Sequence, residues 1–351
     1  MIENGKIWKF TGVGLLVYVI IAGMLIPLKT GIESVKPSYG KAGEVLEIEV
    51  TGYNSHFKEA GNSLRAWLKW ENGKAITSKS LVIKDDRKIT LAFTIPENLP
   101  ENKEVQTVTL LIDNSIDGTS VLPSAVFLTA SKEKVLSEKV NWVIPGDFSN
   151  TSGITFPFRN ILGETIRNTY FHVPLWFGMM FLFLFAVINS IKYLKKGNSE
   201  YDLKAEAFTQ TGIFYGLMGL LTGALWAKNT WGAYWSWDIK QNMTVVALLI
   251  YAAYFILRAS FEDPEKRGRV CAAYGIFAFS TLIPLLYVIP RLTDSLHPGS
   301  GGNPAFGSQD LDNTMRMIFY PAVIGWTLFG FWISSLQFRF LKLKKIQEDL
   351  D

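Results

Sequence analysis

The stretch WGAYWSWD, residues 231–238, lies between two long uncharged runs of the chain, and it ends on a carboxylate. It contains three tryptophans and one tyrosine. Uncharged runs of about 20 residues are typical of helices that cross a lipid bilayer. Tryptophan and tyrosine gather where such helices meet the lipid headgroups, so one hypothesis for this stretch is an interfacial belt. The other hypothesis is a platform of flat rings that binds a large planar ligand.

Uncharged runs of this kind occur six times along the chain. Each has roughly the 17–25 residues that a membrane helix needs, although one of them, 241–257, is at the short end and begins with polar residues. The sequence predicts an all-α polytopic membrane protein with six transmembrane helices. The runs are residues 10–28, 168–191, 207–227, 241–257, 270–290 and 317–338.

Lysine and arginine place both ends of the chain on the cytoplasmic side, because cytoplasmic loops carry an excess of these residues. Fourteen lie in the N-terminus, the second turn, the fourth turn and the tail, against four in the two short segments on the other side. We therefore predict a multi-pass inner-membrane protein whose residues 231–238 face the periplasm. The cytoplasmic lysines and arginines account for most of the net charge of +4, so this charge does not indicate a nucleic-acid partner. We expect membrane lipid to contact these basic residues. The first run is predicted to be an uncleaved anchor, and the single cysteine, Cys271, excludes an intramolecular disulfide.

Between the first and second runs lies a polar insert on the periplasmic side. Its apolar and polar residues alternate at 45–53, 64–70, 88–95 and 107–113, with turn residues between these stretches. This pattern predicts an inserted all-β sandwich, and its opening, VKPSYGKAGEVLEIEVTGYN, resembles immunoglobulin-like domains of the IPT/TIG kind. The predicted domains are a first membrane helix at 1–29, the sandwich at 30–138, an interfacial linker at 139–167 and a five-helix membrane domain at 168–351.

Two of the three histidines are predicted to lie at the periplasmic ends of the membrane helices. His172 opens the second run in YFHVPLWF, and His297 lies between the fifth and sixth runs in RLTDSLHPGS. Histidine is the commonest metal ligand, and ionisable residues at membrane depth are usually functional, although either histidine alone could be structural. Two imidazoles can supply both axial ligands of a haem iron, whereas a zinc site needs four ligands. We therefore predict non-covalently bound haem b. His56, in the sandwich, is predicted to be an ordinary surface residue.

Tryptophan is concentrated around the 231–238 stretch. Trp226, Trp231, Trp235 and Trp237 fall within twelve positions of a 351-residue chain that has 11 tryptophans in all. A belt alone would distribute its tryptophans over both membrane interfaces. The clustering therefore favours a ligand platform, which we assign to these four tryptophans and Tyr234.

Haem propionates need cationic or hydrogen-bonding partners, and arginine matches a carboxylate best. Arg167, five residues before His172, and Lys240, two after Asp238, are placed to serve. Snorkelling of basic side chains at helix ends explains both positions equally well. Asp238 itself would repel propionates, so we expect it to orient a ligand or the loop backbone rather than to contact haem.

The segment WGAYWSWDIK resembles the tryptophan-rich WWD signature of the haem-handling proteins of cytochrome c assembly. The segment RNTYFHVPLWF, the six-run layout and a histidine between the fifth and sixth runs resemble, within that group, the haem exporter protein C (cytochrome c maturation protein C) family. The resemblance implies His172 and His297 as axial ligands, residues 231–238 as the haem platform, and basic positions at Arg167 and Lys240. It further implies a role in cytochrome c biogenesis, with ATP-binding-cassette (ABC) transporter subunits as partners and a periplasmic haem chaperone that receives the haem.

Two departures from the family pattern keep alternatives open. The sandwich is not part of the usual pattern, and the segment DIKQNMT at the end of the motif differs from the family's expected continuation. The wording YWSWD is close to the cytochrome c synthase branch, which usually continues Asp-Pro-Lys-Glu. A synthase, or haem lyase, would attach haem to apocytochrome thiols, but synthases generally carry more external histidines and more spans. A permease without haem is the third hypothesis. The sequence has no recognisable bond-making residues or nucleotide-binding signature, so we predict a delivery protein, not an enzyme, with any ATP hydrolysed by another subunit.

Overall fold

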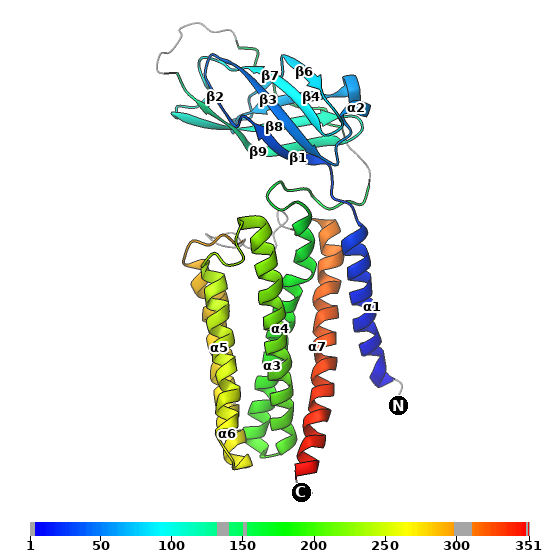
Figure 1. Ribbon diagram of the computed structural model, residues 1–351, viewed down its shortest axis with the longest axis vertical. Helices are drawn as coiled ribbons and strands as arrows, with labels where there is room; N and C mark the ends of the chain where they lie inside the picture. The colour runs from blue at the N-terminus through cyan, green and yellow to red at the C-terminus, as the bar shows by residue number, and fades with distance from the viewer. Residues whose placement is uncertain (1–3, 132–139, 150–152, 298–310, 349, 351) are drawn as a thin grey trace. The chain divides into compact units, whose positions relative to one another are not determined.

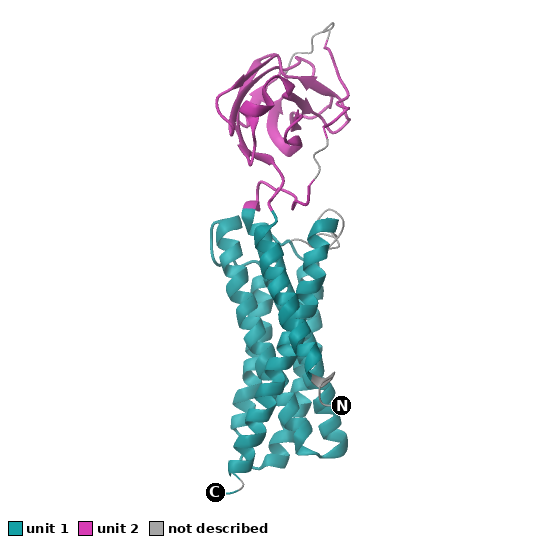
Figure 2. Ribbon diagram, turned by 90° about the vertical axis from the view of Figure 1, so that its right-hand side faces the viewer, with its two compact units in different colours: residues 1–26, 164–351 teal, residues 27–163 magenta. Residues whose placement is uncertain are grey.

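The computed structural model describes residues 4–131, 140–149, 153–297, 311–348 and 350. The chain divides into two compact units, Met1–Ile26 with Glu164–Asp351, and Pro27–Gly163, coloured teal and magenta in Figure 2. The first unit is helical and the second is built mainly from strands (Figure 1). Residue 138, where the sequence predicts the end of the sandwich, lies outside the described residues.

Long helices make up the described part of the helical unit (Figure 1). Five helical segments in it are long and apolar enough to cross a membrane: Lys6–Leu25, Gly163–Lys196, Ile239–Ala259, Pro264–Arg291 and Asn313–Glu348. The long helices are α1 Asn4–Leu25, α3 His172–Lys196, α4 Ser199–Trp231, α5 Ile239–Ala259, α6 Pro264–Ile283 and α7 Asn313–Glu348; the short helical turns are η2 Gly163–Tyr170, η3 Pro284–Val288 and η4 Ile289–Arg291.

The difference between five and the six spans predicted from the sequence concerns α4. This helix has 33 residues and is uncharged from 207 to 227. Its Thr209, Gln210 and Thr211, together with several glycines, make that run less apolar than the other five. The multi-pass helical architecture is thus present, and the sixth span stays a prediction.

Glycines on α4 allow α3 to pack closely against it. A Cβ atom added at Gly212 would lie 2.5 Å from the Phe183 ring, and one at Gly219 would lie 2.6 Å from Trp176. A Cβ atom at Gly223 would lie 2.7 Å from Cε1 of His172. Small residues let helix backbones approach closely in membrane proteins. The glycines of α4 therefore form a groove that holds the large side chains of α3.

A buried ionic cluster joins the first turn of α4 to the last turn of α5. Arg258 donates hydrogen bonds to both carboxylate oxygens of Asp202, at 2.9 and 2.7 Å. Its Nη2 also lies 2.7 Å from Oε2 of Glu206. Bidentate arginine–carboxylate pairs have a fixed geometry, so the cluster holds the two helices in register at the ends remote from residues 231–238.

The second unit is a sandwich of two β-sheets. One sheet has the strand order β1-β3-β7-β6 and the other β2-β9-β8-β4-β5. The strands predicted at 45–53, 64–70, 88–95 and 107–113 are confirmed as β3, β4, β7 and β8. The elements are β1 Gly31–Lys36, β2 Tyr39–Lys41, β3 Val45–Tyr53, α2 Phe57–Ala60, η1 Gly61–Ser63, β4 Arg65–Lys69, β5 Ala75–Thr77, β6 Ser80–Ile83, β7 Lys88–Thr94, β8 Val105–Asn114 and β9 Gly118–Thr129.

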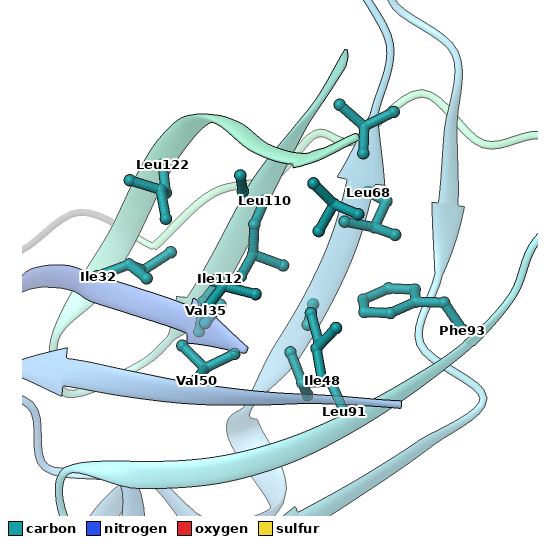
Figure 3. Packing of buried hydrophobic residues seen from close by; sticks show 14 of the residues in the cluster. Ile32, Val35, Ile48, Val50, Leu68, Leu91, Phe93, Leu110, Ile112 and Leu122 are labelled. Atoms are coloured by element: carbon teal, nitrogen blue, oxygen red, sulfur yellow. The ribbon is translucent and has the colours of Figure 1, made fainter. Parts of the chain in front are cut away.

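Alternate residues of these strands fill one core between the two sheets. In a strand, successive side chains point to opposite faces, so every second residue of β3 and of β7 enters the core. They meet side chains from β4 and β8 of the facing sheet, as Figure 3 shows. Residues that are at most 1 % exposed there include Ile48, Val50, Leu68, Leu91, Phe93, Leu110 and Ile112.

Part of the predicted interfacial linker returns to the sandwich. Val143 pairs with Ala75 of β5 in an isolated bridge. The buried carboxylate of Asp113 accepts hydrogen bonds from the Ser149 backbone N–H at 2.9 Å and from Arg65 Nη2 at 2.5 Å. Residues 140–149 are therefore held on the five-stranded sheet by both backbone and side-chain contacts.

Candidate functional site

The aromatic stretch forms the connection between α4 and α5. Helix α4 ends at Trp231, and Gly232 follows in the left-handed conformation (φ 83°) that commonly stops a helix. Asp238 then caps α5 by accepting a hydrogen bond from the Lys240 backbone N–H at 2.9 Å. Trp237, just before the cap, has a positive φ of 58°, which is uncommon for a bulky residue. The strained backbone and the two helix ends fix the course of this loop.

Asp238 connects this loop to the segment that follows α6. Its carboxylate accepts hydrogen bonds from Ser295 Oγ at 2.9 Å and from the Leu296 backbone N–H at 2.8 Å. Its Oδ1 lies 2.8 Å from Nδ1 of His297. Burial alone would raise the pKa of this carboxyl, but the hydrogen bonds from His297 and the two backbone N–H groups outweigh it and hold the pKa well below its usual range. Asp238 is therefore an anion that binds one imidazole.

The contact with Asp238 determines which nitrogen of His297 could bind a metal. A carboxylate only accepts hydrogen bonds, so Nδ1 carries the proton and Nε2 carries the lone pair. Metal-binding histidines usually donate their other ring N–H to a carboxylate or carbonyl, which fixes the ring orientation and raises its basicity. The sequence predicts that Asp238 orients a ligand or the loop backbone, and in the structure its carboxylate contacts the His297 ring and the backbone N–H groups of Lys240 and Leu296.

Two of the predicted platform tryptophans surround the His297 ring. The Trp231 ring lies 4.7 Å from it and the Trp226 ring 6.0 Å, measured between ring centroids. Trp226 and Trp231 also contact each other edge to face at 5.0 Å. The four predicted tryptophans thus form two pairs, because Trp235 contacts Trp237 at 6.4 Å in an edge-to-face pair of its own.

Tyr234 and Trp237 present their rings to the surroundings, with 57 % and 78 % of their surface exposed. Lys228 Nζ lies 5.7 Å from the Tyr234 ring centroid, in a cation–π contact. Exposed aromatic rings of this kind are suited to contact a flat ligand or a partner surface.

His172 lies in the glycine groove of α4. Its Nδ1 is 3.0 Å from the Gly219 carbonyl oxygen and 3.1 Å from Thr222 Oγ1. The carbonyl only accepts, so the proton again belongs on Nδ1 and the lone pair on Nε2. Trp176 Nε1 donates to that Nε2 at 3.3 Å.

The two predicted basic residues have different surroundings. Arg167 Nη1 donates to the carbonyl oxygens of Gly23 and Ile26, each at 2.7 Å, and its Nε donates to Glu164 at 2.5 Å. Arg167 thus caps the end of α1. Lys240 is half-buried in the first turn of α5 and shares that turn with the cap at Asp238.

Several residues that build the site were not singled out from the sequence. Trp176 follows His172 by four residues, a spacing at which helical side chains meet, so HVPLW contained a usable signal. Ser295 and the carbonyl of Gly219 act through contacts between segments far apart in the chain, and the sequence holds no local pattern for them.

The described residues contain no group of three or more His, Cys, Asp or Glu side chains that could hold a bare metal ion. Haem iron needs only one or two axial protein ligands, because the macrocycle fills the other four positions. His297 beside Trp226 and Trp231, and His172 beside Trp176, each carry the proton on Nδ1. Such imidazoles fit that donor requirement better than they fit a protein-only metal site.

Comparisons with known proteins point in the same direction. The family model described as Heme exporter protein C matches residues 149–349. Heme exporter protein C of Paracoccus denitrificans is 24 % identical over 213 residues, 58 % of this chain and 84 % of that protein. Heme exporter protein C of Escherichia coli K12 is 25 % identical over 184 residues, 52 % and 71 %. A putative cytochrome c biosynthesis ccmC-like mitochondrial protein of Marchantia polymorpha is 27 % identical over 110 residues, 31 % of this chain and 43 % of that protein.

Proposed function

The chain belongs to the heme exporter protein C family, and on that premise we propose that it holds haem b non-covalently at the periplasmic ends of its helices and passes it to a periplasmic haem chaperone. Family membership gives it a role in haem handling for cytochrome c biogenesis. The proposal adds the ligands, the side of the membrane and the acceptor.

The observation that carries the proposal is the Asp238–His297 pair with Trp226 and Trp231 around it. Asp238 holds the ring by Nδ1 at 2.8 Å and leaves Nε2 as the nitrogen for iron. Indole rings at 4.7 and 6.0 Å from the imidazole provide apolar faces beside the iron position. Each aromatic contact with a macrocycle is worth about 0.5–1.5 kcal/mol beyond burial alone.

His172 is the proposed second axial ligand. Iron binding at its Nε2 requires the 3.3 Å hydrogen bond from Trp176 to break. A typical hydrogen bond contributes a net 0.5–1.5 kcal/mol, so roughly this much opposes the second ligand. When haem leaves, Trp176 can donate to His172 again. Such an exchange suits a protein that releases its cargo.

The basic residues have separate proposed roles. Lys240, next to the cap at Asp238, is the proposed propionate partner near the platform. Arg167 is held at Nη1 by two carbonyl oxygens of the first helix and at Nε by Glu164. It therefore serves the site less directly than the sequence suggests.

The helix geometry supports six spans. Helices α3 and α4 are joined by a tight turn, in which Gly197 is left-handed and Asn198 caps α4. At about 1.5 Å per residue, the 33 residues of α4 extend about 50 Å, more than the roughly 30 Å of a bilayer core. With α4 counted as a span, both termini lie in the cytoplasm, and the sandwich and the His–Trp site lie on the periplasmic side of the inner membrane.

The proposed partners follow from the family name and from what the sequence lacks. Its sequence carries no nucleotide-binding signature, so ABC transporter subunits supply any ATP hydrolysis. Its described site contains imidazoles, indoles and one carboxylate engaged in hydrogen bonds, which are groups suited to holding haem. The chain is therefore proposed as a delivery protein, with a haem lyase as the alternative to be tested.

A hemin titration of the detergent-purified chain tests the site. The wild type is expected to give a shifted Soret band at one equivalent, and His172→Ala and His297→Ala are each expected to change the band and weaken binding at least tenfold. Trp231→Phe should weaken binding, while the matched Trp332→Phe, at a helical tryptophan remote from the site, should not. Wild-type protein that binds no hemin, or histidine variants that bind as wild type does, would overturn the assignment.

Coexpression with an apocytochrome separates delivery from lyase activity. A delivery protein alone should yield no covalent cytochrome, detected by haem staining after denaturation. Covalent product formed with only this chain present would establish the lyase instead.

A further inference from the structure

The histidine of the sandwich repeats the arrangement found at His297. Its Nδ1 lies 2.8 Å from Oδ1 of Asp117, the same distance as in the Asp238–His297 pair. The Asp117 side chain is only 3 % exposed, as the Asp238 side chain is only 2 % exposed. A buried carboxylate therefore fixes the tautomer of an imidazole twice in this chain, once in each unit.

Asp117 is itself held firmly. Asn114 Nδ2 donates to its Oδ2 at 3.2 Å, and the His56 backbone N–H donates to the same oxygen at 3.0 Å. The carboxylate cannot turn away from the ring without losing these bonds. The hydrogen bond to Asp117 raises the pKa of His56 against the opposing effect of burial, so the ring is a more basic ligand than an ordinary surface histidine.

The other face of this imidazole is open. The His56 side chain is 55 % exposed, and within the described residues no hydrogen bond is made by its Nε2. Nε2 carries the lone pair, because Nδ1 donates to the carboxylate. His56 thus presents a metal-binding nitrogen at the surface, with the carboxylate behind it that metal-binding histidines typically have.

His56 lies at the end of the sandwich where the chain enters and leaves. Asn54 Nδ2 donates to the Leu28 carbonyl oxygen, and Thr30 Oγ1 donates to the Asp117 carbonyl oxygen. Leu28 in turn pairs with Phe156, on the outgoing segment. Leu28 and Phe156, near the two ends of this unit in the sequence, therefore lie close to the loop that holds this imidazole.

The surface beside His56 offers apolar and cationic groups. Ile116, the neighbour of Asp117, is 40 % exposed. Lys58, two residues after His56, lines a hollow of about 520 Å³ whose wall holds both cations and carboxylates. Arg87 there pairs with Glu33 at 3.0 Å, Asp85 and Asp86 are the other acids, and Lys58 and Lys88 are the remaining cations. An apolar side chain can contact a porphyrin face, and cations can pair with propionates.

We propose that His56 is a surface-exposed axial ligand for haem iron on the sandwich. His56 is then a second haem-binding site, rather than the ordinary surface residue that the sequence predicts. This inference rests on the proposed function, in which the helical unit binds haem. A bare metal ion is a poorer occupant, because no group of three or more ligating side chains occurs among the described residues, whereas one imidazole suffices for a haem.

Histidine count makes the test direct. The chain has 3 histidines, so the His172→Ala/His297→Ala protein keeps His56 as its only one. Titrated with hemin as a full chain in detergent, this double variant is expected to shift the Soret band, and adding His56→Gln should abolish the shift. Asp117→Asn in the double variant should weaken binding about 10–100-fold, the usual effect of removing a partner behind a metal ligand. Asp113→Asn, at another buried sandwich carboxylate, is the matched control and should leave binding unchanged in protein that thermal unfolding shows to be folded.

Three results would overturn the inference. If wild type binds hemin and the folded double variant does not, His56 is no ligand, while the proposed function stands. If neither binds, both proposals fail. If the double variant binds Cu²⁺ alone but not hemin, the site is a cation site and the haem assignment is wrong.

Discussion

The Asp238 carboxylate accepts hydrogen bonds from four groups, and Asp238→Ala removes it. Two effects are expected, one on stability and one on haem affinity, and each comes from a different contact. The Lys240 N–H loses its cap acceptor, which costs about 1 kcal/mol of stability, with a range of roughly 0.5–2. His297 loses the carboxylate behind its Nδ1, which should weaken haem binding about 10–100-fold. At 1.36 kcal/mol per factor of ten, that is about 1.4–2.7 kcal/mol of binding free energy.

Asp238→Asn should fall between wild type and alanine. Both Lys240 N–H and His297 Nδ1 contact Oδ1, so an amide oxygen in that position keeps the cap and the ring contact. The amide NH₂ then faces the Leu296 N–H, which the wild-type Oδ2 accepts at 2.8 Å. The variant loses one hydrogen bond and the negative charge, and about a tenfold weaker haem affinity is expected at the low end of the range for such partners.

Equilibrium titration with hemin, followed at the Soret band, measures the affinity, and thermal unfolding in the same detergent measures stability. Asp263→Ala is the matched control, because Asp263 caps α6 through the Glu265 N–H at 2.9 Å, the same distance as in the Asp238 cap, and contacts no histidine in the described structure. It should lose stability by a similar amount and keep its haem affinity. Equal haem affinity in wild type and Asp238→Ala, or equal loss in the two cap variants, would refute the reasoning.

Three further outcomes follow from the same contacts. Gly223→Ala places a Cβ atom 2.7 Å from His172 Cε1, and such overpacking costs about 1–3 kcal/mol; hemin titration should show weaker binding, unlike Gly14→Ala, where nothing lies within 4 Å. Trp176→Phe removes the hydrogen bond that competes for His172 Nε2, so the same titration should show about 2–10-fold tighter binding; unchanged or weaker binding contradicts the exchange. For Asp113, hydrogen bonds outweigh the burial that raises its pKa and leave that pKa below its usual value. Its contribution is therefore present above about pH 3.9 and lost as the pH falls through the folded pKa. Asp113→Asn should lower sandwich stability by about 1–3 kcal/mol at pH 7, by thermal unfolding followed with circular dichroism, and a difference from wild type that stays constant into acid would contradict the assignment.

The helices and strands could largely be predicted because the spacing of apolar residues along each of them is a local property of the sequence. Strand β3 alternates in step with its burial, and the long uncharged runs became helices. Helix α4 shows where this reasoning weakens. Its small and polar residues lower its hydropathy because they serve packing against α3, as Gly219 does for Trp176, rather than contact with lipid.

The candidate site was predictable in its residue types but not in its contacts. The tryptophan cluster and the two histidines stood out by composition and by position relative to the runs. That Asp238 binds His297 depends on a contact across 59 positions, and that Arg167 caps α1 depends on one across 144. Such pairings come from tertiary packing, so the local sequence around each residue does not predict them.

The central claim is that His172 and His297 ligate the same iron. Electron paramagnetic resonance of the full chain loaded with one equivalent of ferric haem, on a His56→Gln background, tests it directly. A low-spin bis-imidazole signal that becomes high-spin in His172→Ala and in His297→Ala is the predicted result. A high-spin signal in the parent protein that neither substitution alters would contradict the account and would leave the tryptophans of 231–238 as an interfacial belt.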